Sequence, residues 1–442
     1  MITVPESVRS SKARAIDDYI QQHNDATVKD SKRPYELNGL RKDLQVYRLP
    51  LSSLIYNIRN GRFAAELREH EATLARRLEP EKLDDALEIE SLLLKDSLKA
   101  EFLRDDIKRV GQMDPGVITD DGAIIDGNRR VAVLRRLHEE TGEARFTYFE
   151  AARLPFDVSA KDLWNIEAGI QLSVDLQASY GPINELMKIK EGIECGHSPR
   201  QVALVLGGEN NEDTVAQKLD RLKLIESYLG YIGKDYKYSE AERKVEHFID
   251  LQNIMRRRDW KEMPAAEKSR MLTAAFELIR CGVAHLRIRE MSKLVKDKDA
   301  RREFVNNVKE KGGAPVNQPI PEKELADVSI EDEIREIKEV ISTPPTQDKQ
   351  SDATQEEAEE ENGQALPEPT QSKKQALEDI LDDAVEKADA KEKRKRPAQM
   401  LSRVKNTLET LLELDRNDLQ QARKEIKKVA QLAERLLDKI GE

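Results

Sequence analysis

The chain has 442 residues, of which 36% are charged and 5% aromatic, and no apolar run approaches the ~20 residues that a membrane-spanning helix needs. This composition is typical of a cytoplasmic, mostly helical protein with a disordered portion, so we expect no membrane partner. Two cysteines and six scattered histidines form neither a disulfide framework nor a zinc-site pattern, and the net charge of −11 does not exclude a nucleic-acid partner, because residues 314–375 alone hold 16 acidic and 6 basic residues.

The N-terminal part of the chain predicts a helix, then a strand, then more helix. We expect residues 1–43 to be an extension with one amphipathic helix at residues 11–23. Residues 44–62 carry Val, Tyr and Ile in partly alternating positions, which predicts a strand that runs into a loop. Leucines recur at roughly helical spacing over residues 63–110, so this stretch predicts helix.

A short α+β pattern follows. Residues 111–126, GQMDPGVITDDGAIID, predict a turn, a strand, an Asp-Asp-Gly hairpin turn and a second strand. A helix is expected from residue 128 to residue 140, and residues 147–149 predict a third short strand. We therefore assign residues 44–159 to one small α+β domain.

The junction between the second strand and its helix has the features of an anion-binding turn. Gly127 allows a tight turn, and the following helix offers unpaired N–H groups and the positive end of its dipole. Arg129 and Arg130 lie in the first turn of that helix, where cations oppose the dipole unless an anion offsets them. Two interpretations stay open: a phosphate-binding turn, or a plain turn whose arginines are solvated or paired with carboxylates.

Residues 160–310 are almost entirely helical in pattern, and residues 198–229 within them predict a helix-turn-helix. Ser198-Pro199 is a typical helix start, and Gly207-Gly208 supplies the turn. The side chains that we expect to contact base edges and phosphates of DNA are Arg200, Thr214, Gln217, Lys218 and Arg221. The alternative is an ordinary helical pair inside a bundle.

The C-terminal part separates into a linker and a helical segment. Residues 311–375 are rich in Pro, Gln, Glu and Thr, which predicts a disordered acidic linker. Residues 376–442 predict helix, with two apolar stripes separated by a polar break at which Asn417 caps the second helix. A helical hairpin of this size cannot bury its own stripes, so we expect a homodimer or a protein partner.

The segment GQMDPGVITDDGAIIDGNRRVAVLRRL resembles the N-terminal domain of the ParB family of chromosome- and plasmid-partition proteins, which shares its fold with sulfiredoxin. That family has a Gly-Gln-Pro-type loop, here Gly111-Gln112 with Pro115, followed by a strand hairpin and a Gly-x-x-Arg turn, here residues 127–130. Residues 57–62, NIRNGR, are similar to the family's opening loop. The order of elements continues through the helix-turn-helix, so the resemblance covers about residues 44–229.

The resemblance implies an α+β N-terminal domain of ParB/sulfiredoxin type, an all-α helix-turn-helix domain, the acidic linker and a C-terminal helical hairpin. It also implies a clamp in which CTP with Mg²⁺ closes the two N-terminal domains of a dimer over double-stranded DNA. The residues that it assigns to the nucleotide are Gly111, Gln112, Pro115, Asp126, Gly127, Asn128, Arg129, Arg130 and Gln171. Partitioning, mobile-element maintenance and defence are settings that fit such a protein.

Departures from the family pattern leave weak CTP hydrolysis and other functions open. Ala132 stands where CTP-hydrolysing members carry a further arginine, and Leu172 replaces the arginine of a Glu-Asn-x-Gln-Arg-type motif. One alternative is a ParB-fold enzyme, a nuclease or a nucleotide-dependent kinase, with a metal held by Asp126 and a second carboxylate from Asp120 or Asp121. Another is a scaffold whose α+β domain has lost its ligand.

Overall fold

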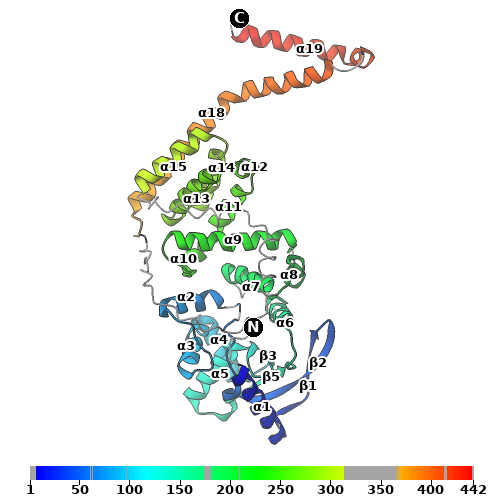
Figure 1. The fold of residues 1–442 in the computed structure, drawn as a ribbon, viewed down its shortest axis with the longest axis vertical. Helices are drawn as coiled ribbons and strands as arrows, with labels where there is room; N and C mark the ends of the chain where they lie inside the picture. Colours follow the sequence, from blue (N-terminus) through cyan, green and yellow to red (C-terminus); the bar gives the residue numbers. More distant parts are fainter. Residues whose placement is uncertain are drawn as a thin grey trace, which may run out of the picture.

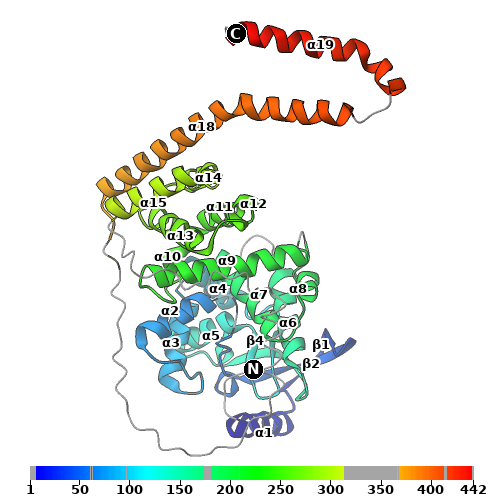
Figure 2. The same cartoon turned by 45° about the horizontal axis from the view of Figure 1, so that its top comes forward.

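The computed structural model describes residues 6–59, 61, 63–95, 97–173, 181–208, 210–312, 366, 368–412 and 416–440. The described chain forms an α+β unit, a helical unit beside it and a long helical arm (Figure 1). The same succession is visible in Figure 2. Among the described residues, none of the helices combines the length with the apolar character that crossing a bilayer requires.

A five-stranded mixed sheet forms the centre of the α+β unit. Its strands are β1 (Thr27–Leu37), β2 (Leu40–Pro50), β3 (Gly116–Ile118), β4 (Ile124–Asp126) and β5 (Tyr148–Arg153). They lie in the order β1-β2-β5-β3-β4, with β3 and β5 parallel and the other neighbours antiparallel. The β3–β4 hairpin and the strand near residue 148 follow the sequence prediction.

The β1–β2 hairpin shows that the sheet begins before residue 44, the start predicted for the α+β domain. Asn38 and Gly39 form the turn with φ values of 52° and 72°, as two-residue hairpin turns require. The sequence pattern did not predict β1 because it reads TVKDSKRPYEL, and only Leu37 of this strand is buried. A strand that lies mostly in solvent lacks the apolar alternation by which strands are recognised.

Helices pack around this sheet. They are α1 (Glu6–Gln22), α2 (Ala64–Leu74), α3 (Leu83–Leu93), α4 (Ser97–Val110) and α5 (Asn128–Thr141), with short 3-10 turns at Leu51–Ser53 and Ala144–Phe146. Val131, Leu134 and Leu137 of α5 are buried in one apolar core with Ile124 of β4 and Phe149 of β5. Burial of this face fixes α5 against the sheet, so its first turn stands at the end of β4.

The chain after residue 160 is helical, as its sequence predicts. The helices of this unit are α6 (Ala160–Ser173), α7 (Pro182–Glu194), α8 (Pro199–Leu206), α9 (Glu212–Tyr231), α10 (Ser239–Glu242), α11 (Val245–Met255), α12 (Arg258–Lys261), α13 (Ala265–Arg280), α14 (His285–Leu294) and α15 (Lys298–Gly312). Trp164 of α6 shares a small apolar core with Val202 of α8 and Val215 of α9, which joins the helix-turn-helix to the rest of the unit.

The arm consists of α18 (Gln371–Leu412) and α19 (Arg416–Ile440). The first half of α18 packs against the helical unit, which the sequence did not predict. That half of α18 lies along α14 and α15 (Figure 1). Its side chains that are buried in the core of the helical unit are Leu377, Ile380, Leu381, Ala384, Val385 and Ala388. Ion pairs from Lys293 to Asp389 and from Lys391 to Asp297 flank this contact. The helical unit therefore includes a segment from beyond the predicted linker.

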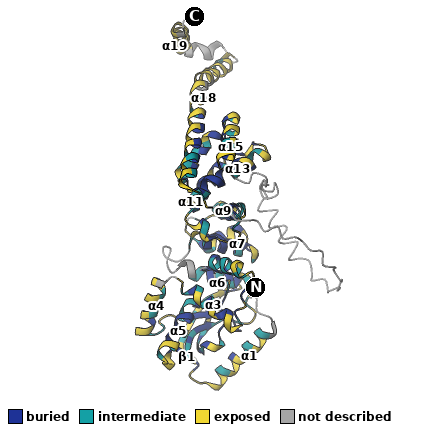
Figure 3. Cartoon of the chain, turned by 90° about the vertical axis from the view of Figure 1, so that its left-hand side faces the viewer, coloured by how far each residue is buried: buried dark blue, intermediate teal, exposed yellow. Residues whose placement is uncertain are grey.

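Two further predictions concern this region. Most of the predicted linker, residues 313–365, lies outside the described residues. Helix α19 starts at Arg416, so Asn417 lies inside the helix and is not its cap. Beyond the docked half of α18, the described side chains of the arm are mostly exposed, as the yellow colour in Figure 3 shows.

Candidate functional site

The turn between β4 and α5 requires a glycine for two reasons. Gly127 has a φ of 117°, a conformation that side chains disfavour. A Cβ atom at this position would also lie 2.4 Å from Cζ of Phe149, whose ring packs against the turn. The Asp-Gly sequence that suggested a phosphate site therefore has a structural explanation as well.

Arg129 and Arg130 are both paired within the protein. Arg130 donates to the carboxylate of Asp126 at 2.5 Å and to the carbonyl oxygen of Asp114. Nε of Arg129 donates at 3.0 Å to the carbonyl oxygen of Leu93, at the end of α3, where a helix offers unpaired acceptors. A phosphate bound at this turn would replace Asp126 as the partner of Arg130.

The predicted loop at Gln112 meets the turn. Nε2 of Gln112 donates to the carbonyl oxygen of Asp114 at 2.9 Å, the same oxygen that Arg130 contacts. The Gln112 amide also pairs with the main chain of Glu150 in β5, at 2.7 and 2.8 Å. Gln112 and Arg130, which the resemblance assigns to the nucleotide, therefore meet at the carbonyl oxygen of Asp114.

Two other predicted nucleotide residues, Gly111 and Pro115, occupy supporting positions. Gly111 ends α4 with a φ of 79°, and its N–H donates to the carbonyl oxygen of Ile107. Pro115 precedes β3, where its fixed φ fits an extended start. Gln171 belongs to α6, but its side chain lies outside the described part of the chain.

Asn128 connects the turn to the loop after β2. Its side chain accepts from the N–H of Asn57 at 3.1 Å and donates to the Asn57 carbonyl oxygen at 3.2 Å. Both residues are buried, so each of these hydrogen bonds satisfies a main-chain group that water cannot reach. The end of this loop is held as well, because the N–H of Gly61 donates to Glu167 of α6 at 3.0 Å.

The carboxylates considered for a metal-dependent enzyme are not gathered near one another. Asp126 stands at the end of β4, whereas Asp120 and Asp121 lie at the tip of the β3–β4 hairpin, where Arg9 pairs with both. In the described residues, no group of three or more His, Cys, Asp or Glu side chains is arranged to hold a metal ion.

Helices α8 and α9 have the local features of a helix-turn-helix. Ser198 and Gln201 form a reciprocal capping box at the start of α8, and Asn211 and Thr214 form another at the start of α9. Gly207 and Gly208 both have positive φ values between the helices. The predicted helix start at Ser198-Pro199 is confirmed, and the second helix is capped by Asn211.

The predicted DNA-contact residues differ in how freely they face solvent. Arg200 is exposed on α8. Nζ of Lys218 donates at 2.6 Å to Glu185 of α7, and Arg221 donates to Gln252 of α11, where burial lowers the pKa of its guanidinium. Thr214 is used in the helix cap, and Gln217 accepts a hydrogen bond from Gln252 through its carbonyl oxygen. Of these five side chains, Lys218 and Arg221 are thus engaged by neighbouring helices.

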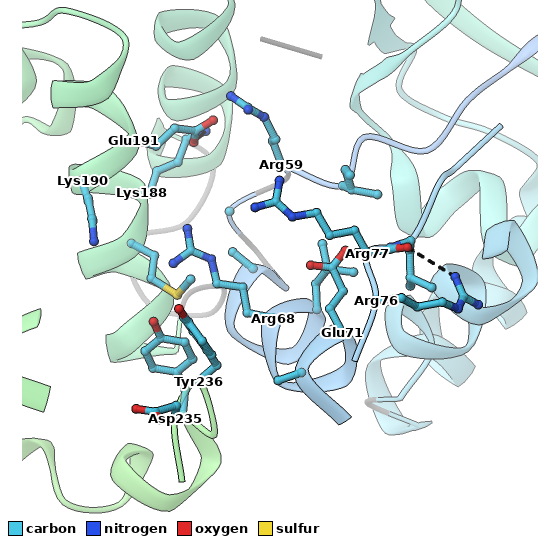
Figure 4. Close-up of a pocket in the computed structure, with 18 of the residues that line it drawn as sticks. Arg59, Arg68, Glu71, Arg76, Arg77, Lys188, Lys190, Glu191, Asp235 and Tyr236 are labelled. Atoms are coloured by element: carbon cyan, nitrogen blue, oxygen red, sulfur yellow. Dashed lines mark hydrogen bonds and ion pairs between the residues drawn. The ribbon is translucent and has the colours of Figure 1, made fainter. Parts of the chain in front are cut away.

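A pocket of about 1120 Å³ lies where α2 approaches α7 and the segment after α9 (Figure 4). Arg59 comes from the loop after β2, Arg68 from α2 and Arg77 from the segment after α2, and all three line this pocket. Lys190 of α7 lies across from them in Figure 4, with Tyr236 below, and Met187 and Tyr238 also line the pocket.

Sequence reasoning noted Arg59 in a family-like loop but did not single out Arg68 or Arg77. These two arginines stand in a charged helical segment, REHEATLARR, in which no motif distinguishes them from solvated charges. Only the fold brings residues 59–77 to the side chains of α7 and of residues 236–238.

Neither a protein-family model, nor a curated protein, nor a solved structure matches this chain.

Proposed function

We propose that this chain is a cytoplasmic ParB-like DNA-binding protein, a nucleotide-responsive clamp or adaptor for partitioning, mobile-element maintenance or defence. The observation that carries the proposal is the helix-turn-helix of α8 and α9, with both starts capped, which follows a small mixed α+β unit and two intervening helices. This is the order of elements that the sequence resemblance to the ParB family implies.

Double-stranded DNA is the proposed partner of the helix-turn-helix. Arg200 offers an exposed cation at the start of α8, and Lys218 and Arg221 offer two more on α9 once they exchange Glu185 and Gln252 for phosphate oxygens. The exposed acidic side chains at the start of α9 disfavour close approach of the backbone there. The proposed contact therefore runs from α8 towards the middle of α9.

A nucleotide, CTP with Mg²⁺, is the proposed cofactor. The region that we propose for it is the turn at Gly127 together with the loop that Asn128 holds through Asn57. Self-association through the C-terminal helices is the third part of the proposal, because α18 and α19 expose apolar side chains over the arm.

The DNA contact is tested with the double variant Lys218→Ala and Arg221→Ala in fluorescence-anisotropy titrations of a labelled duplex. We expect weaker binding and a salt slope smaller by about 2, since two phosphate contacts are removed. Arg136→Ala is the matched control, because this arginine is 62% exposed on α5 and only loosely paired with Glu140 at 3.9 Å. Unchanged binding and slope in the double variant would remove α9 from the interface.

A further inference from the structure

We infer that the pocket between α2, α7 and the segment after α9 binds a small phosphate-bearing ligand of nucleotide size through Arg59, Arg68 and Arg77. The inference rests on the nucleotide part of the proposed function, but it moves the phosphates from the Gly127 turn to these three arginine side chains. These side chains lie outside the turn at Gly127.

The three arginines have unused hydrogen-bonding capacity. Within the described residues, no carboxylate pairs with Arg59 or Arg77, and both side chains are exposed. Arg68 has the hydroxyl of Tyr238 as its neighbour. Figure 4 shows the side chains of Arg59, Arg68 and Arg77 reaching into the same hollow. Guanidinium groups so arranged match the planar, two-oxygen faces of phosphate groups.

Several carboxylates that line the pocket are already bound by the protein. Oε1 of Glu71 accepts from the N–H of Leu78 at 2.9 Å, and Glu191 accepts from Nζ of Lys188 at 2.7 Å. Glu226 accepts from Lys190 and from the hydroxyl of Tyr238. Asp235 lies at the other end of the pocket from Arg59 in Figure 4, and Glu194 is exposed at the rim. Glu79 and Glu81 also line the pocket, and Oε1 of Glu79 accepts from Nζ of Lys82 at 2.6 Å. Arg59 and Arg77 are the cations that this lining offers to an anion.

The other end of the pocket suits a flat ring. Tyr236 is 56% exposed and has a φ of 60°, a conformation that costs a bulky residue free energy and is concentrated at functional sites. Its neighbours Met187 and Tyr238 add apolar surface. A volume of about 1120 Å³ accommodates a base, a sugar and several phosphates. An aromatic wall facing a cluster of arginines is complementary to a nucleotide.

Hydrogen bonds hold Asn57 and Gly61, described residues on either side of Arg59, before any ligand arrives. Asn128 holds Asn57, and Glu167 holds Gly61. Lys188 in turn pairs with Glu167 at 2.8 Å, which connects the loop to the wall of the pocket on α7. Such preorganisation lowers the entropy lost on binding. The Gly127 turn thus supports the pocket through Asn128 and need not bind phosphate itself.

The test is calorimetric titration of CTP, ATP and inorganic pyrophosphate, each with Mg²⁺, into the full chain and four variants. We expect the double variant Arg59→Gln and Arg77→Gln to weaken all three ligands at least 10-fold, and Arg68→Gln to weaken them too. Tyr236→Asn tolerates the same backbone conformation but removes the ring, so it should weaken the nucleotides and leave pyrophosphate unchanged. Arg130→Gln decides between the two sites, because only phosphates held at the Gly127 turn would lose affinity in this variant. Thermal melting confirms that each variant is folded.

Other outcomes separate the two proposals. Binding that is lost in Arg130→Gln but kept in Arg59→Gln with Arg77→Gln would overturn the inference and place the nucleotide at the Gly127 turn. Absence of binding for all three ligands, with duplex DNA still bound, would overturn the inference and leave a nucleotide-independent DNA-binding protein. Equal affinities for pyrophosphate and for the two nucleotides would mean that the base is not recognised, which would overturn the nucleotide part of the inference.

Discussion

Lys188 is a buried cation held between two carboxylates, Glu167 and Glu191, at 2.8 and 2.7 Å. Replacing it with methionine leaves those two carboxylates without their counter-charge, and we expect Lys188→Met to lower the free energy of unfolding by about 3–5 kcal/mol. Lys190→Met is the matched control on the same helix. That lysine is 37% exposed and pairs with Glu226 at 3.5 Å, so we expect less than about 1 kcal/mol. Urea denaturation measures both, and equal effects would contradict the account.

The stabilisation that Lys188 provides depends on pH in a direction that its pKa shift defines. Burial alone would lower the pKa of Lys188, but Glu167 and Glu191 outweigh it and raise the pKa above its usual 10.5. A raised folded-state pKa means that the stabilisation is complete below about pH 10.5 and is lost as the pH rises through the folded-state value. The difference in unfolding free energy between the wild type and Lys188→Met should therefore be constant from neutral pH to about pH 9 and shrink in stronger alkali. A difference that grows with pH would contradict this sign.

Gly127 and Gly142 form a natural pair for testing the turn. Both have positive φ values, at the start and the end of α5, but only at Gly127 would a Cβ meet another residue, Phe149, at 2.4 Å. We expect Gly142→Ala to cost about 1 kcal/mol of stability from backbone strain, and Gly127→Ala to cost more because the clash adds to it. Urea denaturation compares the two. Similar losses would show that the ring of Phe149 adjusts without cost.

For single residues, the sequence showed which positions of the Gly127 turn are distinctive, but it did not show which residues they contact. Gly127, Asn128 and the two arginines stand out by their pattern. What they contact is decided by residues such as Leu93 and Asn57, which are 36 and 71 positions away. No local pattern indicates that a helix end and a loop carbonyl would arrive there.

Among the elements, those with strong apolar periodicity were predictable and those with polar surfaces were not. The helices after residue 160 and the β3–β4 hairpin follow from spacing alone. The β1–β2 hairpin lacks that periodicity, although its Asn38-Gly39 turn is a recognised hairpin signal that could have revealed it. The pocket of Arg59, Arg68 and Arg77 was unpredictable because three segments that are far apart in the sequence form it.

Substitutions of buried residues test whether the first half of α18 docks on the helical unit. Leu381 is fully buried in the helical unit, whereas Leu401, further along the same helix, is 55% exposed. We expect Leu381→Ala to reduce the free energy of unfolding by about 2–5 kcal/mol and Leu401→Ala to have little effect. Denaturation followed by circular dichroism measures both. A negligible effect of Leu381→Ala would mean that α18 is not part of the core.

Over the whole molecule, the exposed arm predicts self-association. Ile426, Val429, Leu432 and Leu436 recur on α19 at helical spacing and are partly or largely exposed, so a second copy is the simplest partner that covers them. We expect Ile426→Glu with Val429→Glu to weaken the dimer at least 10-fold without unfolding the chain. Lys427→Glu adds acidic charge beside the stripe and should leave the dimer intact. Sedimentation velocity over a concentration series measures this, and a monomeric wild type at all concentrations would contradict the prediction.

The central claim is that the protein binds double-stranded DNA. The most direct measurement is an anisotropy titration of a labelled duplex with the full chain at several salt concentrations, with and without CTP and Mg²⁺. The account predicts saturable binding whose logarithm falls linearly with the logarithm of salt concentration, and which changes when CTP is added. Absence of saturable binding even at low salt, with and without CTP, would contradict it.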